Sequence, residues 1–319
     1  MSPAKKIAVV DIGTNSVRLV VALANGRRIE SVLFQDGRIT RLGEGLAEHG
    51  QISRGAVDRT VSVLSVYAGH IRSYAPDCAL YVGTSALRQA ENREEVLARF
   101  EREAGIPVRI ISGEEEAALT YRGALLDLDE AQGPFLVIDI GGGSSELIVG
   151  ETVRKFWKAF SVEVGVVTLT EGWFRSDPPS DQEIQQVRRY LEERFREVVT
   201  VLSPYLTAGV TPVGTAGSVT TILAMVRKMV PYDPARVHGQ GLSRQEVERL
   251  FSEIRPMKAK DRLLLPGVER GREDIILSGT LILLSLLEFV RQGGLVVSAY
   301  GLREGIVLDL SDPGSESLL

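Results

Sequence analysis

Hydrophobic residues fall in short, strand-like runs that alternate with longer stretches of helical spacing. In the first half, the short runs predict two strands of a hairpin within residues 6–23 and further strands over residues 80–82 and 108–111. Apolar residues that recur every three or four positions predict helices over residues 53–74 and 113–126. A further helix is predicted after Ser85, and Gly105 ends it. Ser53 and Ser112 stand where helix N-caps are expected. This alternation is typical of an α/β domain.

The second half repeats the same alternation. Its short apolar runs predict strands over residues 135–140, 146–149, 211–213 and 295–298. Its helical spacing predicts helices over residues 181–202, after Ser218, after Ser243, over residues 273–291, and from Leu302 onward. The longest apolar run, residues 275–287, falls short of the roughly 20 residues that a membrane span needs. We therefore predict a buried helix there and no association with a membrane.

Two glycine-containing turns in the first half reappear in the second half in the same order. Asp11-Ile-Gly-Thr-Asn-Ser16 is similar to Asp139-Ile-Gly-Gly-Gly-Ser144. The second pair is Val82-Gly-Thr-Ser-Ala86 and Val213-Gly-Thr-Ala-Gly217. The second turn follows the first by 71 residues in one half (11 to 82) and by 74 in the other (139 to 213). Two matches in register predict a duplicated domain.

Composition narrows the class of protein. A chain of 319 residues with 44% hydrophobic content is long enough for about two domains with ordinary cores. The formal net charge of −5 argues against a general nucleic-acid binder, which usually carries a basic surface. The single cysteine, Cys78, excludes an intrachain disulfide and a multi-cysteine metal site. Because no apolar leader with a cleavage site precedes the first strand, we expect a cytoplasmic protein.

The Asp-Ile-Gly turns suggest phosphate chemistry. Each follows a hydrophobic strand and places a carboxylate beside several backbone N–H groups and hydroxyls. Amides hold an anion and the carboxylate reaches a metal, so the combination suits a phosphate with Mg²⁺. One such turn alone is a weak signal, because Asp and Gly also occupy the turn positions of an ordinary hairpin.

The order of six motifs resembles that of the exopolyphosphatase/guanosine-pentaphosphatase (Ppx/GppA) family. The motifs are Asp11-Ile-Gly-Thr-Asn-Ser-Val-Arg18, Gly83-Thr-Ser-Ala-Leu-Arg88, Ile111-Ser-Gly-Glu-Glu-Glu-Ala117, Asp139-Ile-Gly-Gly-Gly-Ser-Ser-Glu146, Gly214-Thr-Ala-Gly-Ser218 and Tyr300-Gly-Leu-Arg-Glu-Gly305. The resemblance implies an α/β fold of two duplicated actin-like (ribonuclease H-like) domains with a central cleft. We place domain I at residues 1–126, with a C-terminal helix within 300–319 packing back on it, and domain II at residues 127–299.

The resemblance also implies roles for particular residues. Glu116 would be the general base, Glu146 would bind metal or orient water, and Arg88 would neutralise phosphate. Asp11, Asp139 and Glu146 would bind Mg²⁺, for which Mn²⁺ can substitute, and a monovalent cation is a further candidate cofactor. The implied substrate-binding residues are Gly13, Thr14, Asn15, Ser16, Arg18, Thr84, Ser85, Gly141, Gly142, Gly143, Ser144, Ser145, Gly214, Thr215, Gly217 and Arg303.

Structural roles compete with some of these assignments. Glutamates in the first turn of a helix are favoured by its macrodipole, which accounts for Glu114 and Glu115 without catalysis. Arg18 and Arg303 are as well explained by ion pairs that hold the fold. If Glu146 has no role in the site, it would be an ordinary strand residue that faces solvent.

The function that follows is exopolyphosphatase activity, the metal-dependent release of orthophosphate from the end of inorganic polyphosphate. Hydrolysis of the 5′-phosphate of pppGpp to give ppGpp is the alternative. A kinase of the same superfamily, or an actin-like assembly protein, would share the fold and the phosphate turns. The chain lacks the C-terminal extension of the long family members, so we expect short polyphosphate to be favoured. We also expect a homodimer.

Overall fold

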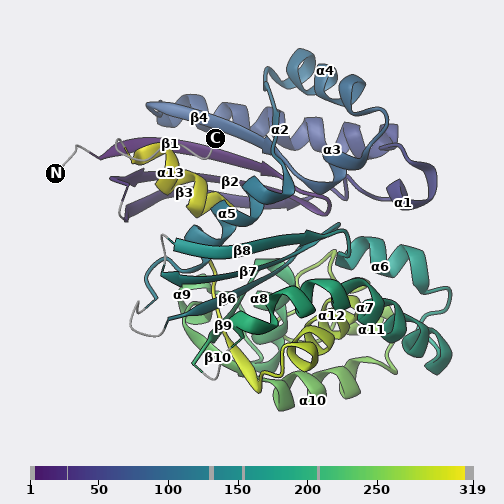
Figure 1. Cartoon of the computed structure of the whole chain (residues 1–319). Coiled ribbons are helices and arrows are strands. Elements are labelled where there is room, and N and C mark those ends of the chain that lie inside the picture. Colours follow the sequence, from purple (N-terminus) through teal and green to yellow (C-terminus); the bar gives the residue numbers. More distant parts are fainter. Residues whose placement is uncertain (1–3, 27, 129–132, 153–154, 207–208, 313–319) are drawn as a thin grey trace. The chain divides into compact units, whose positions relative to one another are not determined.

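The computed structural model describes residues 4–26, 28–128, 133–152, 155–206 and 209–312 (Figure 1). The chain divides into two compact units. Unit 1 consists of Met1–Leu126 together with Gly301–Leu319, and unit 2 consists of Asp127–Tyr300. Within the described ranges, no helix is long and apolar enough to cross a membrane.

Unit 1 is built on a five-stranded sheet with the order β3-β2-β1-β4-β5. Its strands are β1 (Lys5–Ile12), β2 (Ser16–Ala24), β3 (Ile29–Ile39), β4 (Cys78–Gly83) and β5 (Arg109–Ile110). The first three strands are antiparallel neighbours, whereas β4 and β5 run parallel to β1. Parallel neighbours need crossover connections, and these are supplied by helices.

Helices cover both faces of this sheet. They are α1 (Leu46–His49), α2 (Arg54–Tyr74), α3 (Ser85–Gln89), α4 (Arg93–Ala104), α5 (Gly113–Ala124) and α13 (Leu302–Ser311). One face packs on α2, α3 and α4 through residues such as Leu64, Leu87 and Phe100. The other face packs on α5 and α13 through Leu119 and Ile306. The predicted caps are present, because the Ser53 and Ser112 side chains accept backbone N–H bonds within their helices.

The helices α5 and α13 approach each other at the level of their backbones. A Cβ atom placed on Gly123 of α5 would lie 1.9 Å from the carbonyl oxygen of Gly301. A Cβ atom on Gly305 of α13 would lie 1.9 Å from the carbonyl oxygen of Leu119. Only glycine therefore fits at these two positions, which we call the glycine seam. Arg122 of α5 adds a hydrogen bond of 3.0 Å to the carbonyl of Gly26.

Unit 2 repeats the strand order of unit 1 and adds one strand. Its sheet has the order β10-β11-β9-β6-β7-β8. The strands are β6 (Phe135–Ile140), β7 (Ser145–Thr152), β8 (Lys155–Val162), β9 (Thr211–Thr215), β10 (Gln240–Ser243) and β11 (Gly294–Val297). The strand order β8-β7-β6-β9-β11 of unit 2 corresponds to the order β3-β2-β1-β4-β5 of unit 1. Each pair of neighbouring strands is parallel or antiparallel in the same way in both units. The predicted α/β class and the predicted duplication are thereby confirmed.

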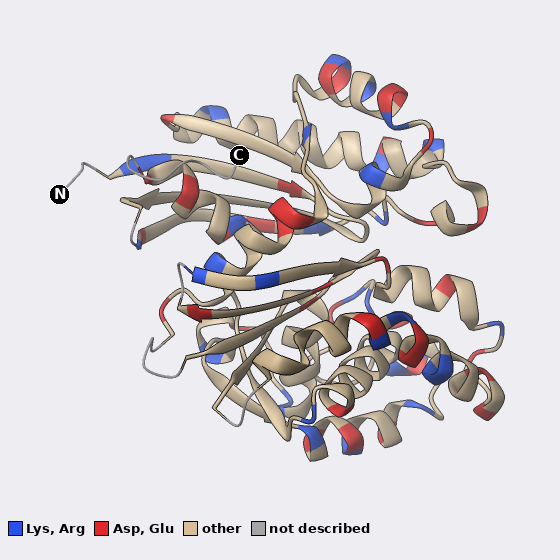
Figure 2. Cartoon of the chain, viewed as in Figure 1, with Lys and Arg blue, Asp and Glu red and all other residues tan. Residues whose placement is uncertain are grey.

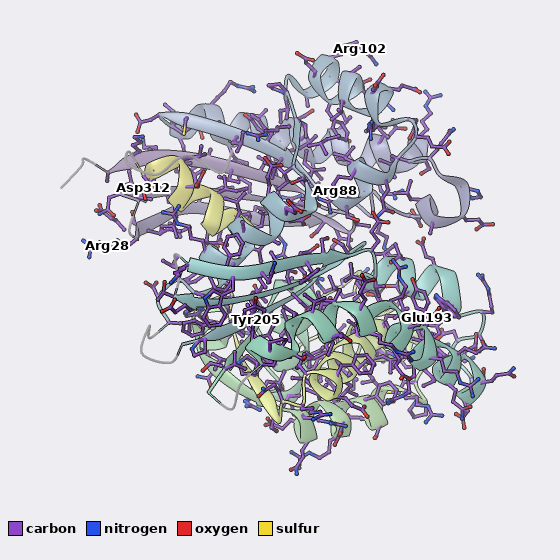
Figure 3. The ribbon with its side chains drawn as sticks, viewed as in Figure 1. Arg28, Arg88, Arg102, Glu193, Tyr205 and Asp312 are labelled. Carbon is purple, nitrogen blue, oxygen red and sulfur yellow. The ribbon has the colours of Figure 1, made fainter. Side chains whose placement is uncertain are left out.

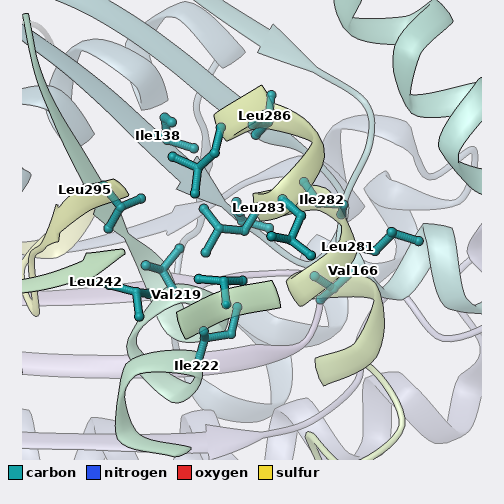
Figure 4. Packing of buried hydrophobic residues seen from close by; sticks show 14 of the residues in the cluster. Ile138, Val166, Val219, Ile222, Leu242, Leu281, Ile282, Leu283, Leu286 and Leu295 are labelled. Carbon is teal, nitrogen blue, oxygen red and sulfur yellow. The ribbon is translucent and has the colours of Figure 1, made fainter. Parts of the chain in front are cut away.

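The helices of unit 2 surround an extensive apolar core. They are α6 (Val166–Trp173), α7 (Asp181–Leu202), α8 (Ala216–Val226), α9 (Pro234–Val237), α10 (Arg244–Ile254), α11 (Ala259–Arg262) and α12 (Ile276–Phe289), with the 3₁₀ turn η2 (Ser203–Tyr205). Figure 4 shows Leu281, Leu283 and Leu286 of α12 among side chains from neighbouring elements. Because α12 is apolar on every side, it is buried within the unit, as its sequence predicts.

Three strands have no counterpart among the predicted elements. They are the edge strands β3, β8 and β10, and many of their residues are exposed or only half-buried. The predicted C-terminal helix is present over Leu302–Ser311, and residues 313–319 lie outside the described part of the chain.

Candidate active site

The turn between β1 and β2 leaves backbone N–H groups available to an anion. It is closed by a hydrogen bond of 3.0 Å from Gly13 N to Ser16 O. The carbonyls of Thr14 and Asn15 accept hydrogen bonds from backbone N–H groups within residues 40–43, and these bonds fix the conformation of the turn. In the described part of the chain, the amide groups of Thr14 and Asn15 donate to no other atom. Such consecutive amides form an anion-binding concavity.

Asp11 lies at the end of β1 beside this turn and is a candidate metal ligand. Its Oδ1 atom is fully buried and has no hydrogen-bond partner in the protein, and the same holds for Nδ2 of Asn15. Burial raises the pKa of Asp11 to about 6, although Arg18 and Arg303 lower it. A buried carboxylate oxygen and a buried amide without partners are costly unless a ligand satisfies them. The residues present therefore fit a cation and a phosphate.

We expect Asp11→Asn to stabilise the metal-free protein at neutral pH while impairing metal binding. The raised pKa means that the folded protein holds a proton which the unfolded chain releases near pH 3.8. Stability from the neutral carboxyl is therefore lost as pH rises from about 4 to about 6, at most by about 3 kcal/mol. Urea unfolding in chelator at pH 5 and pH 7.5 tests this. If wild type and variant differ equally at both pH values, the prediction fails.

Arg88 and Glu116 form an ion pair in unit 1. Arg88 is on α3 (labelled in Figure 3) and Glu116 is in the first turn of α5. The Arg88 Nη1 atom donates to Glu116 Oε2 at 2.6 Å and to the Ile111 carbonyl at 3.2 Å. Their side chains are only 19% and 12% exposed, so the pair is shielded from water. Glu115, by contrast, serves the capping box of α5 with Ser112.

The turn between β6 and β7 reproduces the first turn. Gly141 N donates to Ser144 O at 2.9 Å, and the carbonyls of Gly141 and Gly142 accept from the N-terminus of α6. The amides of Gly142 and Gly143 have no partner among the described residues. A Cβ atom on Gly165 would lie 2.3 Å from the Gly142 backbone, so that glycine lets α6 seat against the turn.

Four polar residues form one row across the sheet of unit 2. In register they are Thr215 of β9, Asp139 of β6, Glu146 of β7 and Ser161 of β8. Directly paired residues point to the same face of a sheet. Glu146 is 1% exposed and accepts a hydrogen bond from Ser161 Oγ at 2.7 Å. The buried position of Glu146 contradicts the solvent-facing interpretation of this residue.

The predicted metal ligands are divided between the two units. Asp11 belongs to unit 1, whereas Asp139 and Glu146 belong to unit 2. Among the described residues, no group of three or more His, Cys, Asp or Glu side chains is placed to hold a metal ion. Mg²⁺ in phosphate sites is usually held by one or two carboxylates, with waters and phosphate oxygens completing its shell. The Asp139–Glu146 pair and Asp11 each meet that requirement.

Several predicted substrate-binding residues hold the fold around the turns. The hydroxyl of Ser145 donates to the Val164 carbonyl at 2.6 Å, and that of Ser85 accepts from Gln89 at 2.9 Å. Thr215 Oγ1 donates to the Tyr300 carbonyl at 2.5 Å. Arg303 donates to the Leu19 carbonyl at 3.3 Å. Their roles toward substrate stay predictions.

The second pair of turns also shares its geometry. The carbonyls of Gly83 and Gly214 accept from Ile111 N and Ser298 N, at 3.1 and 2.8 Å. Thr84, which follows Gly83 in the first of these turns, is buried.

Arg272 is a cation beside the second unit's turn that the motifs did not reveal. A Cβ atom on Gly217 would lie 2.5 Å from its Nη2 atom. We add Arg272 to the candidate site because its guanidinium is buried against this turn. No sequence motif connects it to Gly217.

The comparisons with known proteins decide the family. The family model described as the Ppx/GppA phosphatase family matches residues 5–313. The chain belongs to the Ppx/GppA phosphatase family. Exopolyphosphatase 2 of Mycobacterium tuberculosis is 32% identical to this Ppx/GppA phosphatase over 320 residues, which cover 96% of this chain and 98% of that protein.

Solved structures of similar proteins agree with this membership. The Aquifex aeolicus Ppx-GppA enzyme is 34% identical, with a TM-score of 0.79, over 96% of this chain and 99% of that one. An exopolyphosphatase-like protein is 30% identical, with a TM-score of 0.89, over 96% and 98%. The predicted family and the predicted hydrolase class are confirmed, and this Ppx/GppA phosphatase is a hydrolase.

Proposed function

We propose that the protein is a metal-dependent exopolyphosphatase that releases orthophosphate from the end of inorganic polyphosphate and favours short chains. The observation that carries this proposal is the duplicated turn with free amides, which lies beside the buried Asp11 Oδ1 atom in unit 1 and beside the buried Glu146 in unit 2. Such turns suit a ligand made of successive phosphates, since each offers donors to anionic oxygens. The similarity to exopolyphosphatase 2 supports the same substrate class.

The reaction assigns one role to each group. Glu116 accepts a proton from water as the water oxygen bonds to the terminal phosphorus and the bridging P–O bond breaks. The products are orthophosphate and a polyphosphate one unit shorter. Arg88 offers positive charge to the phosphoryl oxygens from beside the base. Asp11 in unit 1 and the Asp139–Glu146 pair in unit 2 would each offer carboxylate ligands to Mg²⁺, which supplies further positive charge to the phosphate oxygens when bound.

The preference for short chains rests on charge. Figure 2 shows basic and acidic residues mixed along helices such as α4 and α10, and the net charge of the chain is −5. Each basic contact to a polyanion adds to its affinity in a salt-dependent way. Few contacts beyond the terminal phosphates imply weak additional binding of long chains.

Hydrolysis of pppGpp is the second candidate function. It presents the same terminal phosphoanhydride, and the family description covers both enzyme names. The catalytic groups therefore do not distinguish the two substrates.

The test is phosphate release by purified protein from short polyphosphate, long polyphosphate, pppGpp and ATP, each with Mg²⁺ and with excess chelator. We expect the highest kcat/KM for short polyphosphate and no activity in chelator. A tenfold preference for pppGpp over every polyphosphate would establish the alternative. No release from any substrate would refute both. Sedimentation with ATP and Mg²⁺ is expected to show no polymers, which separates an enzyme from an assembly protein. The homodimer and the cytoplasmic location stay predictions.

A further inference from the structure

Glu146 is placed between two polar neighbours on adjacent strands. In the register of β6, β7 and β8 it lies directly opposite Asp139 on one side and Ser161 on the other. Paired residues on adjacent strands have Cβ atoms about 4.5–5.5 Å apart and share a face of the sheet. Ser161 therefore reaches Glu146 from the side away from Asp139.

The contact between Ser161 and Glu146 is a hydrogen bond with a defined direction. Ser161 Oγ lies 2.7 Å from Glu146 Oε1, and the hydroxyl is the donor. A hydrogen bond to an ionised carboxylate is stronger than one between neutral groups and fixes the orientation of the acceptor. The remainder of the Glu146 carboxylate is then held toward the same face as Asp139. In the described chain, the Ser161 side chain makes no other hydrogen bond.

The duplicated unit offers an internal comparison. At the position equivalent to Glu146, unit 1 has Arg18, which lies opposite Asp11. At the position equivalent to Ser161 it has Gly37, opposite Arg18. A Cβ atom on Gly37 would lie 3.6 Å from Arg18 Cγ, an ordinary contact, so space does not force a glycine there. Unit 2 thus has the Ser161 hydroxyl beside the Glu146 carboxylate, whereas unit 1 has no hydroxyl at the equivalent position beside Arg18.

We propose that Ser161 is a positioning residue that orients Glu146 for binding of the divalent cation. The proposal rests on the proposed function, because it takes Glu146 as a metal-binding or water-orienting group. Partners that orient a metal ligand typically contribute ten- to a hundredfold to metal affinity or activity. Ser161 sits on an edge strand and is exposed, so its hydroxyl is dispensable for packing.

The test compares Ser161→Ala, Ser161→Thr and the control Ser252→Ala. Ser252 is also exposed and donates to a backbone carbonyl, that of Glu248, away from the candidate site. The first readout is the thermal shift of substrate-free protein against Mg²⁺ concentration. We expect Ser161→Ala to raise the half-maximal Mg²⁺ concentration roughly tenfold, with an unchanged Tm in chelator. Ser161→Thr keeps the hydroxyl, so its half-maximal Mg²⁺ concentration is expected to stay near that of wild type. The control Ser252→Ala is expected to match wild type as well.

A double-mutant cycle with Glu146→Gln gives the second readout, kcat for phosphate release. If Ser161 acts through Glu146, Ser161→Ala lowers kcat roughly tenfold in wild type and has little effect in the Glu146→Gln background. Equal effects in both backgrounds would overturn the proposal and indicate direct contact with substrate. An unchanged Mg²⁺ titration, or a lowered Tm in chelator with no change in Mg²⁺ dependence, would also overturn it. If wild type releases no phosphate, the proposed function fails, and the Mg²⁺ titration still decides the role of Ser161.

Discussion

Replacing Glu116 with glutamine is expected to lower turnover a hundredfold or more while leaving the fold and phosphate binding intact. Glutamine keeps the shape of the side chain, and its amide oxygen still accepts the hydrogen bond from Arg88. It does not accept a proton from water at neutral pH. General base catalysis contributes on the order of 10²–10⁴ in rate, so the loss is of that order. Phosphate release from short polyphosphate measures the effect.

Two neighbouring glutamates give matched controls for this substitution. Glu114 is exposed, and the same change there is expected to leave turnover within twofold. Glu115 accepts hydrogen bonds from the Ser112 amide in the capping box. Its replacement by glutamine is expected to lower stability slightly, by up to about 1 kcal/mol, without a specific effect on chemistry. Turnover of Glu116→Gln within a few-fold of wild type would remove Glu116 from the role of base.

Substituting alanine for Gly305 is expected to lower the free energy of unfolding more than any other substitution proposed for this protein. The added methyl group would meet the carbonyl oxygen of Leu119 at 1.9 Å, and that oxygen belongs to the helical backbone of α5. The clash has no flexible side chain to relieve it, so α5 and α13 must separate. Overpacking of this kind costs about 3 kcal/mol or more, or roughly 10 °C in Tm. Thermal unfolding measures it, and turnover should fall as well because α5 carries Glu116.

Gly69 provides the control for the glycine seam. It lies within α2, and a Cβ atom there would have nothing within 4 Å. Gly69→Ala is expected to raise stability by about 0.5–1 kcal/mol, because alanine is the better helix former. If Gly305→Ala were as stable as wild type, the close approach of the two helices would be wrong.

Buried elements were predictable from the sequence because their apolar patterns are continuous. The strand β1 and the helix α12 are examples, since both are buried along most of their length. The edge strands β3 and β8 were not predictable in this way. Their residues are mostly exposed or half-buried, and the Asp36-Gly37 pair within β3 has the composition of a turn. The alternation that marks a strand is weak where neither face is fully buried.

For the candidate site, the sequence located single residues but not their partners. The composition of the turn after Asp11 indicates phosphate chemistry, and the resemblance to the Ppx/GppA family singled out Glu116. The bond from Arg88 to Glu116 joins residues 28 positions apart, and it depends on how α3 and α5 pack in unit 1. Ser161 faces Glu146 only because β7 and β8 pair in one particular register. Contacts of this kind come from tertiary structure, which local patterns do not encode.

The glycine seam affects the order in which the protein is assembled during synthesis. Unit 2 is continuous in sequence, whereas unit 1 needs α13, which follows unit 2 along the chain. Domains generally fold as units while the ribosome is still translating. Unit 2 can therefore fold first, while the helix that carries Glu116 still lacks its α13 partner and the apolar side chains of Ile306 and Val307. The unit that carries Glu116, the proposed base, is completed only after the residues of α13 have left the ribosome.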